Sequence, residues 1–191
     1  MKRWIPLLFA LMITAQWLVP AKIIWDSESV LSDGVLYKFK TYPIDPSDPF
    51  RGKYVTLNFK ASMFKTDSST KFDEKTVFAT LDNDSSGFAR VVKLSNSRPA
   101  SKDYIEVTIQ NSFIGRGYER EFFLKFPFER FYVEESKAAE AERAYWQASR
   151  DSTQQAYALV SVDRGSAILK DVVINGRSVV DIVEELNRPK N

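Results

Sequence analysis

Residues 43–59 read Pro-Ile-Asp-Pro-Ser-Asp-Pro-Phe-Arg-Gly-Lys-Tyr-Val-Thr-Leu-Asn-Phe, a crowded bend joined directly to an aromatic, β-branched run. The three prolines of residues 43–49 fix φ and remove three amide donors, so this part forms neither a helix nor a central strand. Asp45 and Asp48 can cap the bend with their side chains. Gly52 follows where the chain must turn sharply. The stretch therefore predicts a turn that sets the start and the register of the strand behind it.

Outward from this bend, the chain reads as a series of half-buried strands. Residues 35–42 precede the bend and residues 54–65 follow it, and both are rich in aromatic and β-branched side chains. Short turns that contain glycine, such as Asp163-Arg164-Gly165 and Asn175-Gly176, predict antiparallel hairpins. The other strands are expected at residues 77–81, 88–94, 104–109, 121–126, 128–133, 156–162 and 166–173.

One soluble helix is expected over residues 134–147, because its acidic start suits the helix dipole. Small residues recur there at helical spacing and form a narrow stripe: Ala138, Ala141, Ala144 or Tyr145, and Ala148. Residues 179–186 form a short amphipathic tail. The predicted fold is mainly β, an antiparallel β domain with one inserted α-helix, preceded by an N-terminal transmembrane helix.

The N-terminal segment predicts a membrane anchor. Residues 4–19 are almost entirely apolar and follow Lys2 and Arg3, whose charges keep this end in the cytoplasm. Continued to Trp25, a helix of residues 4–25 spans roughly 33 Å, which matches a bilayer core. The tryptophans at both ends suit the membrane interfaces.

This anchor divides the chain into residues 1–25, in the cell membrane, and residues 26–191, a β-rich extracytoplasmic (periplasmic) domain. The protein is then single-pass, with its N-terminus in the cytoplasm. A cleaved signal peptide is the alternative, because Val19-Pro20-Ala21 has the form of a small-residue cleavage site.

The composition restricts the chemistry. The 191 residues include no cysteine and no histidine, which excludes disulfides, thiol nucleophiles, Cys/His zinc sites and the commonest general base. The net charge of +2 comes from Lys2 and Arg3, so the body of the chain is balanced. It has no basic run of the kind that nucleic-acid binding requires. We therefore expect no cofactor and no nucleic-acid partner.

Two short patterns suggest specific chemistry. Residues 82–87, Asp-Asn-Asp-Ser-Ser-Gly, match the start of a calcium loop, but its twelfth position is Lys93, where a bidentate Glu should bind the metal. We expect no metal there. The spacing of Ser62 and Lys65, repeated at Ser68 and Lys71, matches serine/lysine acyl enzymes, which place the Ser on a helix. Neither pair lies on a predicted helix, and no catalytic residue is assigned.

Two functional interpretations remain. The first is a membrane-anchored binding or assembly module of the bacterial envelope. The second is an envelope hydrolase of the Ser/Lys or carboxylate type. A concave pocket with Ser62 or Ser68 beside a lysine of lowered pKa would favour the hydrolase.

The sequence resembles the GDYXXLXY family, which comprises membrane-anchored bacterial proteins without an assigned activity. Gly52, Tyr54, Leu57 and Phe59 take the family's Gly, first Tyr, Leu and final aromatic positions, while Lys53 stands where the family has Asp and Phe59 where it has Tyr. Residues 128–134 resemble its Glu-Arg-aromatic-aromatic-Val segment, and residues 160–176 its closing hairpin. The motif residues, structural or binding, are Asp45, Pro46, Asp48, Arg51, Gly52, Tyr54, Leu57, Phe59, Glu129 and Arg130.

The resemblance implies a partner that is a multi-span membrane protein, since relatives of this kind are often encoded next to one or fused with one. It specifies no ligand and no biological process. The residues alone favour a structural role for the bend, which starts a strand in register. Glu129 and Arg130 are adjacent in a predicted strand, so they point to opposite faces and cannot both line one site.

Overall fold

The computed structural model describes residues 4–42, 54–72, 74–115, 117–132 and 154–186, together with the helical positions 141, 143, 145 and 148. The elements are α1 (Ile5–Asp33), β1 (Val35–Tyr42), β2 (Tyr54–Thr56), β3 (Asn58–Phe59), the 3-10 turn η1 (Lys60–Ser62), β4 (Met63–Asp67), β5 (Thr76–Asn83), β6 (Ala89–Ser95), β7 (Tyr104–Ile114), β8 (Glu119–Lys125), β9 (Arg130–Tyr132), β10 (Ala156–Asp163), β11 (Ser166–Ile174), β12 (Arg177–Ser178) and α3 (Val179–Leu186).

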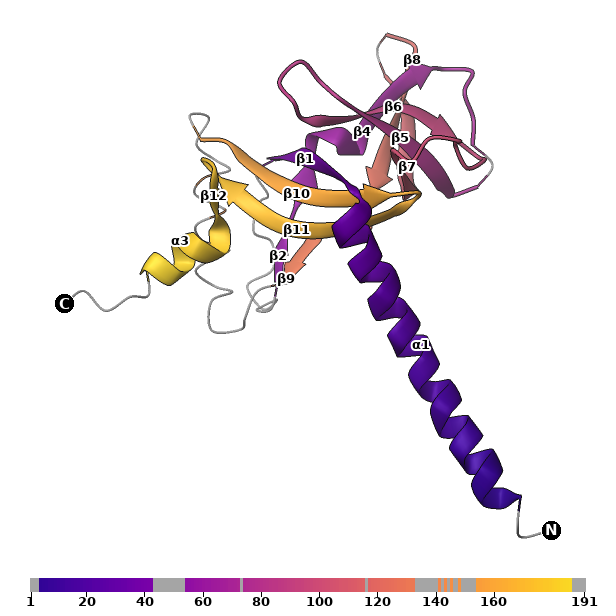
Figure 1. The fold of residues 1–191 in the computed structure, drawn as a ribbon. Helices are drawn as coiled ribbons and strands as arrows, with labels where there is room; N and C mark the ends of the chain where they lie inside the picture. The colour runs from indigo at the N-terminus through magenta and orange to yellow at the C-terminus, as the bar shows by residue number, and fades with distance from the viewer. Residues whose placement is uncertain are drawn as a thin grey trace.

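Within the described ranges, the strands form two five-stranded antiparallel sheets and one two-stranded ladder. The first sheet has the order β12-β11-β10-β1-β3 and the second the order β4-β8-β7-β5-β6, while β2 pairs with β9. In Figure 1 the first sheet crosses the middle of the molecule, the second lies above it, and α1 leaves on the other side. The prediction of a mainly β, antiparallel fold is confirmed.

Alternating burial explains why these segments are strands. β5 and β10 place every second side chain inside, as a strand with one buried face requires. The inward side chains of both sheets join in one core, which includes Phe39 and Val160 from the first sheet and Val107 and Leu124 from the second.

The tip of the β10–β11 hairpin joins the two sheets. Gly165 has φ +97°, in the left-handed region that favours glycine, and forms a parallel bridge with Ile105 of β7. Its N–H donates to the Tyr104 carbonyl at 3.0 Å, and its carbonyl accepts from the Glu106 N–H at 3.0 Å. The predicted turn at Gly165 therefore also connects the first sheet to the second through backbone hydrogen bonds.

Four phenylalanine rings form the centre of the core. Phe39 lies 5.0–5.6 Å, centroid to centroid, from the rings of Phe59, Phe126 and Phe128, in edge-on arrangements. Phe126 and Phe128 stack at 5.2 Å. Edge-on and stacked pairs of this kind are favourable beyond the area that they bury. Segments 39, 59 and 126–128, far apart in sequence, are thus held at one point.

The strand predicted over residues 54–65 is wrong as a single element. The structure divides it into β2, β3, η1 and β4, and β4 joins the second sheet by pairing with β8. The register brings Met63 opposite Phe123. The uniform composition of this run hides the break, because an aromatic, branched stretch suits each short strand equally well.

The helices extend and refine the predictions. α1 continues eight residues beyond Trp25, to Asp33, where Ser161 Oγ donates a buried hydrogen bond of 2.6 Å to the Val30 carbonyl. Ala141, Tyr145 and Ala148, three members of the predicted stripe, are buried in the core. Residues 179–186 are the helix α3. Among the helices of the described residues, none combines the length and the apolarity that a membrane crossing needs.

Candidate functional site

The two motif segments lie side by side although more than seventy residues separate them in sequence. β2 pairs with β9 so that Tyr54 lies opposite Tyr132 and Thr56 opposite Arg130. The ladder continues beyond the strands, because the Leu57 N–H donates to the Glu129 carbonyl at 2.8 Å. Residues 54–57 of the first motif segment are therefore paired with residues 129–132 of the second.

The structure places two of the described motif side chains in the core. Leu57 and Phe59 are buried, and Phe59 belongs to the cluster of four phenylalanines. A structural role is thus established for these two residues. Tyr54 contributes its backbone to β2. Five predicted site residues lie outside the described residues: Asp45, Pro46, Asp48, Arg51 and Gly52.

A pocket of about 350 Å³ opens where the motif segments meet. Its size falls within the range of small-molecule sites. Its lining combines apolar and polar side chains from β1, β3, η1, β4, β7, β8 and the residue before β9: Tyr42, Asn58, Phe59, Ser62, Met63, Gln110, Phe123, Leu124 and Glu129. We call this the motif pocket.

Glu129 is the motif pocket's one charged lining residue among the described residues. Its backbone is fixed by the bond from Leu57, and its Oε1 accepts a 3.2 Å hydrogen bond from the Phe126 N–H. Burial raises the pKa of Glu129, while the Phe126 N–H and the charges of Lys125 and Arg130 act in the opposite direction. The carboxylate is thus held in one place and partly removed from water.

Arg130 and Tyr132 lie on the opposite face of β9 from the buried Phe131. Tyr132 is 67% exposed, whereas Phe128 and Phe131 are buried. Arg130 is exposed and does not line the motif pocket. Glu129 precedes β9 and lines the motif pocket, whereas Arg130 lies in β9 and does not line it. The aromatic side chains of residues 128–132 are core apart from Tyr132.

Ser62 and Lys65, the first serine/lysine pair, do not meet the condition for a hydrolase, which is a pocket serine beside a lysine of lowered pKa. Ser62 lines the motif pocket, but Lys65 lies on the next strand and pairs with Glu121 at 2.7 Å. The hydrogen bond and charge of Glu121 raise the pKa of Lys65. A lysine that acts as a base needs a lowered pKa, so Lys65 has the opposite electrostatic environment.

The acidic segment of residues 82–87 closes the β5–β6 hairpin. Asp84 Oδ1 accepts hydrogen bonds from the N–H groups of Ser86, at 2.8 Å, and Phe88, at 2.9 Å. These bonds lower the pKa of Asp84. Gly87 has φ +77°, which completes the turn. Across the described ranges, the structure holds no group of three acidic side chains arranged for a metal ion.

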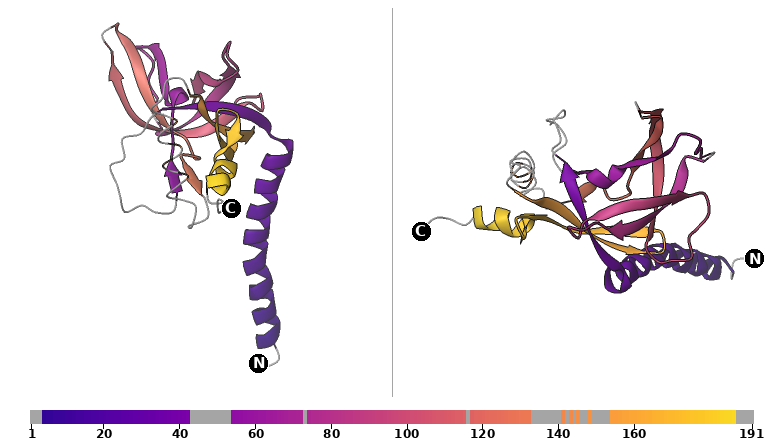
Figure 2. Two further views of the ribbon diagram at one scale, coloured as in Figure 1. Left: turned by 90° about the vertical axis from the view of Figure 1, so that its left-hand side faces the viewer. Right: turned by 90° about the horizontal axis from the view of Figure 1, so that it is seen from above.

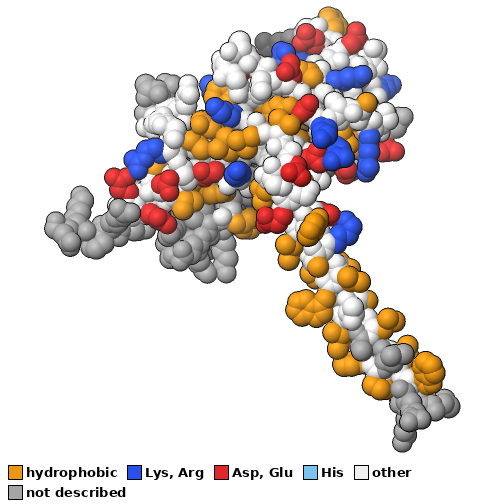
Figure 3. All heavy atoms as spheres, viewed as in Figure 1, with side chains coloured by type: hydrophobic (Ala, Val, Ile, Leu, Met, Phe, Trp, Pro, Cys, Tyr) orange, Lys and Arg blue, Asp and Glu red, His pale blue; other side chains and the backbone are white. Residues whose placement is uncertain are grey.

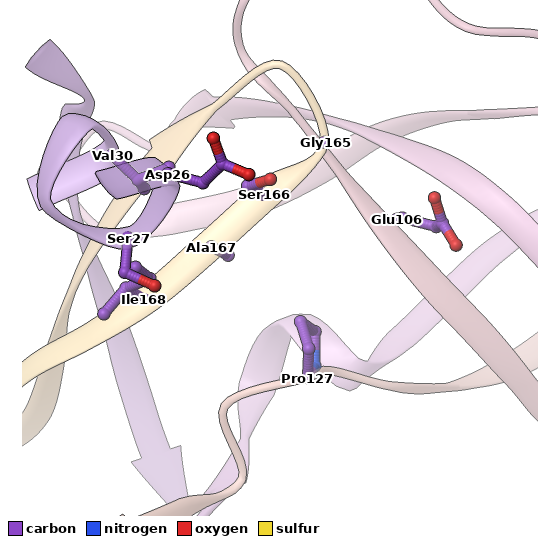
Figure 4. Close-up of a pocket in the computed structure, with 9 residues that line it drawn as sticks. All are labelled: Asp26, Ser27, Val30, Glu106, Pro127, Gly165, Ser166, Ala167 and Ile168. Carbon is purple, nitrogen blue, oxygen red and sulfur yellow. The ribbon is translucent and has the colours of Figure 1, made fainter. Parts of the chain in front are cut away.

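A second cavity, of about 380 Å³, lies at the base of α1. In Figure 4 the Asp26 side chain extends from α1 toward Ser166 of β11, while Glu106 lies across the opening on β7. Asp26 also pairs with Lys22 one helical turn away. Glu106 and Pro127 continue the lining into a third cavity of about 230 Å³, which Lys125 also lines. None of the motif residues that the structure describes lines the cavity at the base of α1.

Sequence reasoning missed the pocket residues Tyr42, Asn58, Gln110 and Phe123. Asn58 offered a signal, as a polar residue between the buried Leu57 and Phe59 of the motif. Gln110 and Phe123 offered none, because they reach the pocket only through the β4-β8-β7 register.

The fold and the site define a class: an antiparallel β domain carried on an N-terminal helix, with two distant aromatic segments paired beside a pocket that holds one carboxylate. The sequence matches the family described as GDYXXLXY protein over residues 16–172. The chain belongs to the GDYXXLXY family, and the match runs from the middle of α1 into β11. Neither a curated protein nor a solved structure matches the chain.

Proposed function

We propose that this chain is a membrane-anchored binding or assembly module of the bacterial envelope that acts with a multi-span membrane protein. The bare apolar surface of α1 is the observation that carries the proposal. In Figures 1 and 3 this helix projects from the domain, and apolar side chains cover it along its length. The described side chains of residues 4–25 that are large, apolar and exposed are Trp4, Leu8, Phe9, Leu11, Met12, Ile13, Trp17, Leu18, Val19, Ile23, Ile24 and Trp25.

These side chains surround the helix, since the consecutive exposed residues 11–13 and 17–19 cover all its faces. Leaving one such side chain in water costs roughly 1.5–3 kcal/mol relative to burial. A bilayer removes that cost at once, and residues 4–25 match its thickness at about 33 Å. Lys2 and Arg3 favour a cytoplasmic N-terminus, so the β domain is extracytoplasmic.

The junction of α1 with the domain supports an assembly role. The Val30 carbonyl accepts hydrogen bonds from Ser161 Oγ and from the Gly34 N–H, the latter at 3.1 Å. The helix is therefore docked on β10 and is not joined to it by a loose linker. A domain held at the membrane surface meets membrane proteins at high effective concentration, so a modest interface suffices.

Tyr132, an exposed residue of the family-like segment 128–134, is well placed for that interface. β2 and β9 extend on the side of the domain from which α1 leaves, whereas the second sheet lies on the far side (Figures 1 and 2). β9 therefore lies on the side of the domain that is nearer the proposed membrane. A hydrolase remains the alternative, with Ser62 and Glu129 in the motif pocket as its polar groups.

Cysteine labelling tests the topology, because the chain contains no cysteine of its own. Ser101→Cys places a thiol on an exposed position of the domain, and a cysteine inserted directly after Met1, at position 2 of that variant, places one before the anchor and keeps both basic residues. A membrane-impermeant maleimide should label position 101 in intact spheroplasts and position 2 only after lysis. Alkaline carbonate should leave the chain in the membrane fraction. Its release, or labelling of position 101 only after lysis, would contradict the anchor.

Photocrosslinking tests the partner. A benzophenone side chain at Tyr132 should give an adduct with a multi-span membrane protein. Tyr118 is the matched control, because it is an equally accessible tyrosine, 82% exposed, before β8 of the second sheet. It should not give that adduct. Adducts with the protein itself alone, or with soluble peptides alone, would refute a membrane-protein partner.

A further inference from the structure

We propose that the motif pocket binds a primary aliphatic ammonium group, with the charge at Glu129 and the carbon chain against Phe59, Phe123 and Leu124. The inference names the ligand chemistry of the binding module, and so rests on the proposed binding role. It does not depend on the membrane anchor. The ammonium could belong to a free amine or to a lysine of a partner, and both present the same chemistry to the pocket.

The negative charge of Glu129 favours a cationic ligand in the motif pocket. Glu129 is the single charged side chain among the described residues that line the pocket. The charges of Lys125 and Arg130 act on the Glu129 carboxylate, but neither residue lines the motif pocket. Lys125 lines the third cavity together with Glu106. Arg130 is exposed on β9. Among the described lining residues, the pocket thus combines one negative charge with apolar and neutral polar side chains. An anionic ligand would meet repulsion from this carboxylate, and a neutral ligand would gain no charge attraction from it.

The polar lining suits an ammonium in particular. An –NH₃⁺ group has three donors and no acceptor. Asn58, Ser62 and Gln110, each with a side-chain oxygen that can accept a hydrogen bond, line the same pocket as Glu129. These residues come from β3, η1 and β7, so three separate elements supply them. A compact point charge with freely rotating donors fits such an arrangement better than the planar fork of a guanidinium.

The apolar lining suits a carbon chain. Phe59 and Leu124 are buried, Phe123 is half-buried, and Met63 lies at the exposed side. A stem packed against these side chains loses its contact with water. Each buried methylene then raises the affinity by roughly fourfold. The volume of about 350 Å³ accommodates a chain of lysine length with room for its backbone.

Proton linkage gives a second signature. Burial raises the pKa of Glu129, and a bound cation favours the ionised carboxylate. The Phe126 N–H, Lys125 and Arg130 act on the same group and favour ionisation too. Ammonium affinity should therefore fall about tenfold per pH unit as the pH drops below the pKa of Glu129.

The test measures binding to the full-length chain in zwitterionic phosphatidylcholine nanodiscs, with empty nanodiscs as the blank. The probes are n-butylammonium, ethylammonium, n-butanol and butyrate, followed by saturation-transfer NMR and calorimetry. Butylammonium should bind at least tenfold more tightly than butanol or butyrate. It should exceed ethylammonium by roughly fourfold for each added methylene.

Glu129→Gln should reduce butylammonium binding at least tenfold. It keeps an oxygen that can accept the Phe126 N–H, and circular dichroism checks that the variant is folded. Glu106→Gln is the matched control, because it removes a carboxylate that lines the cavity at the base of α1 and the third cavity. This substitution should leave the affinity for butylammonium unchanged. Equal binding of butanol, or equal loss in both variants, would overturn the proposal.

A blocked lysine tripeptide distinguishes the two sources of the ammonium. If it binds at least as tightly as butylammonium, the ligand is a partner's lysine. If only the free amine binds, the ligand is a small amine. Both results support the ammonium site, and the failure of both probes to bind refutes it. Failed labelling or crosslinking with retained ammonium binding would reject the anchor or the partner and leave the pocket chemistry intact.

Discussion

Gly34→Ala tests whether α1 is docked rigidly on the β domain. Gly34 has φ −71°, which alanine adopts freely, so any destabilisation of the folded state by the substitution is steric. A Cβ at this position would overlap the Val30 carbonyl oxygen and Ser161 Oγ, and would lie 3.1 Å from the Val162 carbonyl oxygen. Two of these atoms belong to the backbone and cannot rotate away. The end of the helix must therefore move relative to β10.

That movement breaks two hydrogen bonds to the Val30 carbonyl, from the Gly34 N–H at 3.1 Å and from Ser161 Oγ at 2.6 Å. Each is worth about 0.5–1.5 kcal/mol, so their loss costs about 1–3 kcal/mol. The lower chain entropy of alanine in the unfolded state returns about 0.4–1 kcal/mol. Steric loss outweighs the entropic gain, and we expect a net destabilisation of about 1–2 kcal/mol.

Urea unfolding of the full-length chain, followed by the strand signal in circular dichroism, measures this change. Gly117→Ala is the control, since no heavy atom lies within 4 Å of its added Cβ, and its effect should stay within about 0.5 kcal/mol. Ser161→Ala should cost less in the Gly34→Ala background than alone, because both changes act on one hydrogen-bonded group. A Gly34→Ala protein as stable as the parent would refute the docked junction.

The remaining predictions concern the core, a buried phenol and a turn. Phe39→Ala removes the ring that contacts three others and should lower the free energy of unfolding in urea by about 3–5 kcal/mol. Phe113→Ala, at an exposed phenylalanine, should lower it far less. Equal losses in the two variants would refute the central role of the phenylalanine cluster. Burial raises the pKa of Tyr145 to about 12, so the unfolded chain loses this proton first and stability should fall by up to about 1.4 kcal/mol per pH unit from pH 10 to 12. Tyr145→Phe should remove that part of the pH dependence, and an unchanged slope would contradict it. Asp84→Ala should speed hydrogen exchange at the Phe88 amide, its partner at 2.9 Å, and unaltered exchange would show that this bond does not hold the turn.

Local sequence signals were sufficient for much of the fold. The turn at Gly165 and the turn at Asn175-Gly176 formed as predicted, because residues in the left-handed region and a short connection fix a hairpin without help from distant segments. The stripe of Ala141, Tyr145 and Ala148 is buried for a similar reason, since helical spacing alone places these residues on one face.

The candidate site depended on contacts that no local pattern encodes. A strand pattern states which residues share a face but not which distant strand lies beside them, so the pairing of β2 with β9 was not foreseen. The break of residues 54–65 at η1 has the same cause, because it is set by where β3 and β4 find their partners in different sheets.

The sequence thus established the alternation, the turns and the apolar N-terminal helix, which depend on residues close together in the chain. The motif pocket arises from packing over long separations. Glu129 faces Phe59 and Gln110 only because the rings of residues 39, 59, 126 and 128 bring the two motif segments together and the β4-β8-β7 register places Gln110 beside them. Bringing segments so far apart in sequence together costs conformational entropy, and only the burial of the shared core offsets that cost. The core includes side chains from the whole folded chain, so no local pattern determines it.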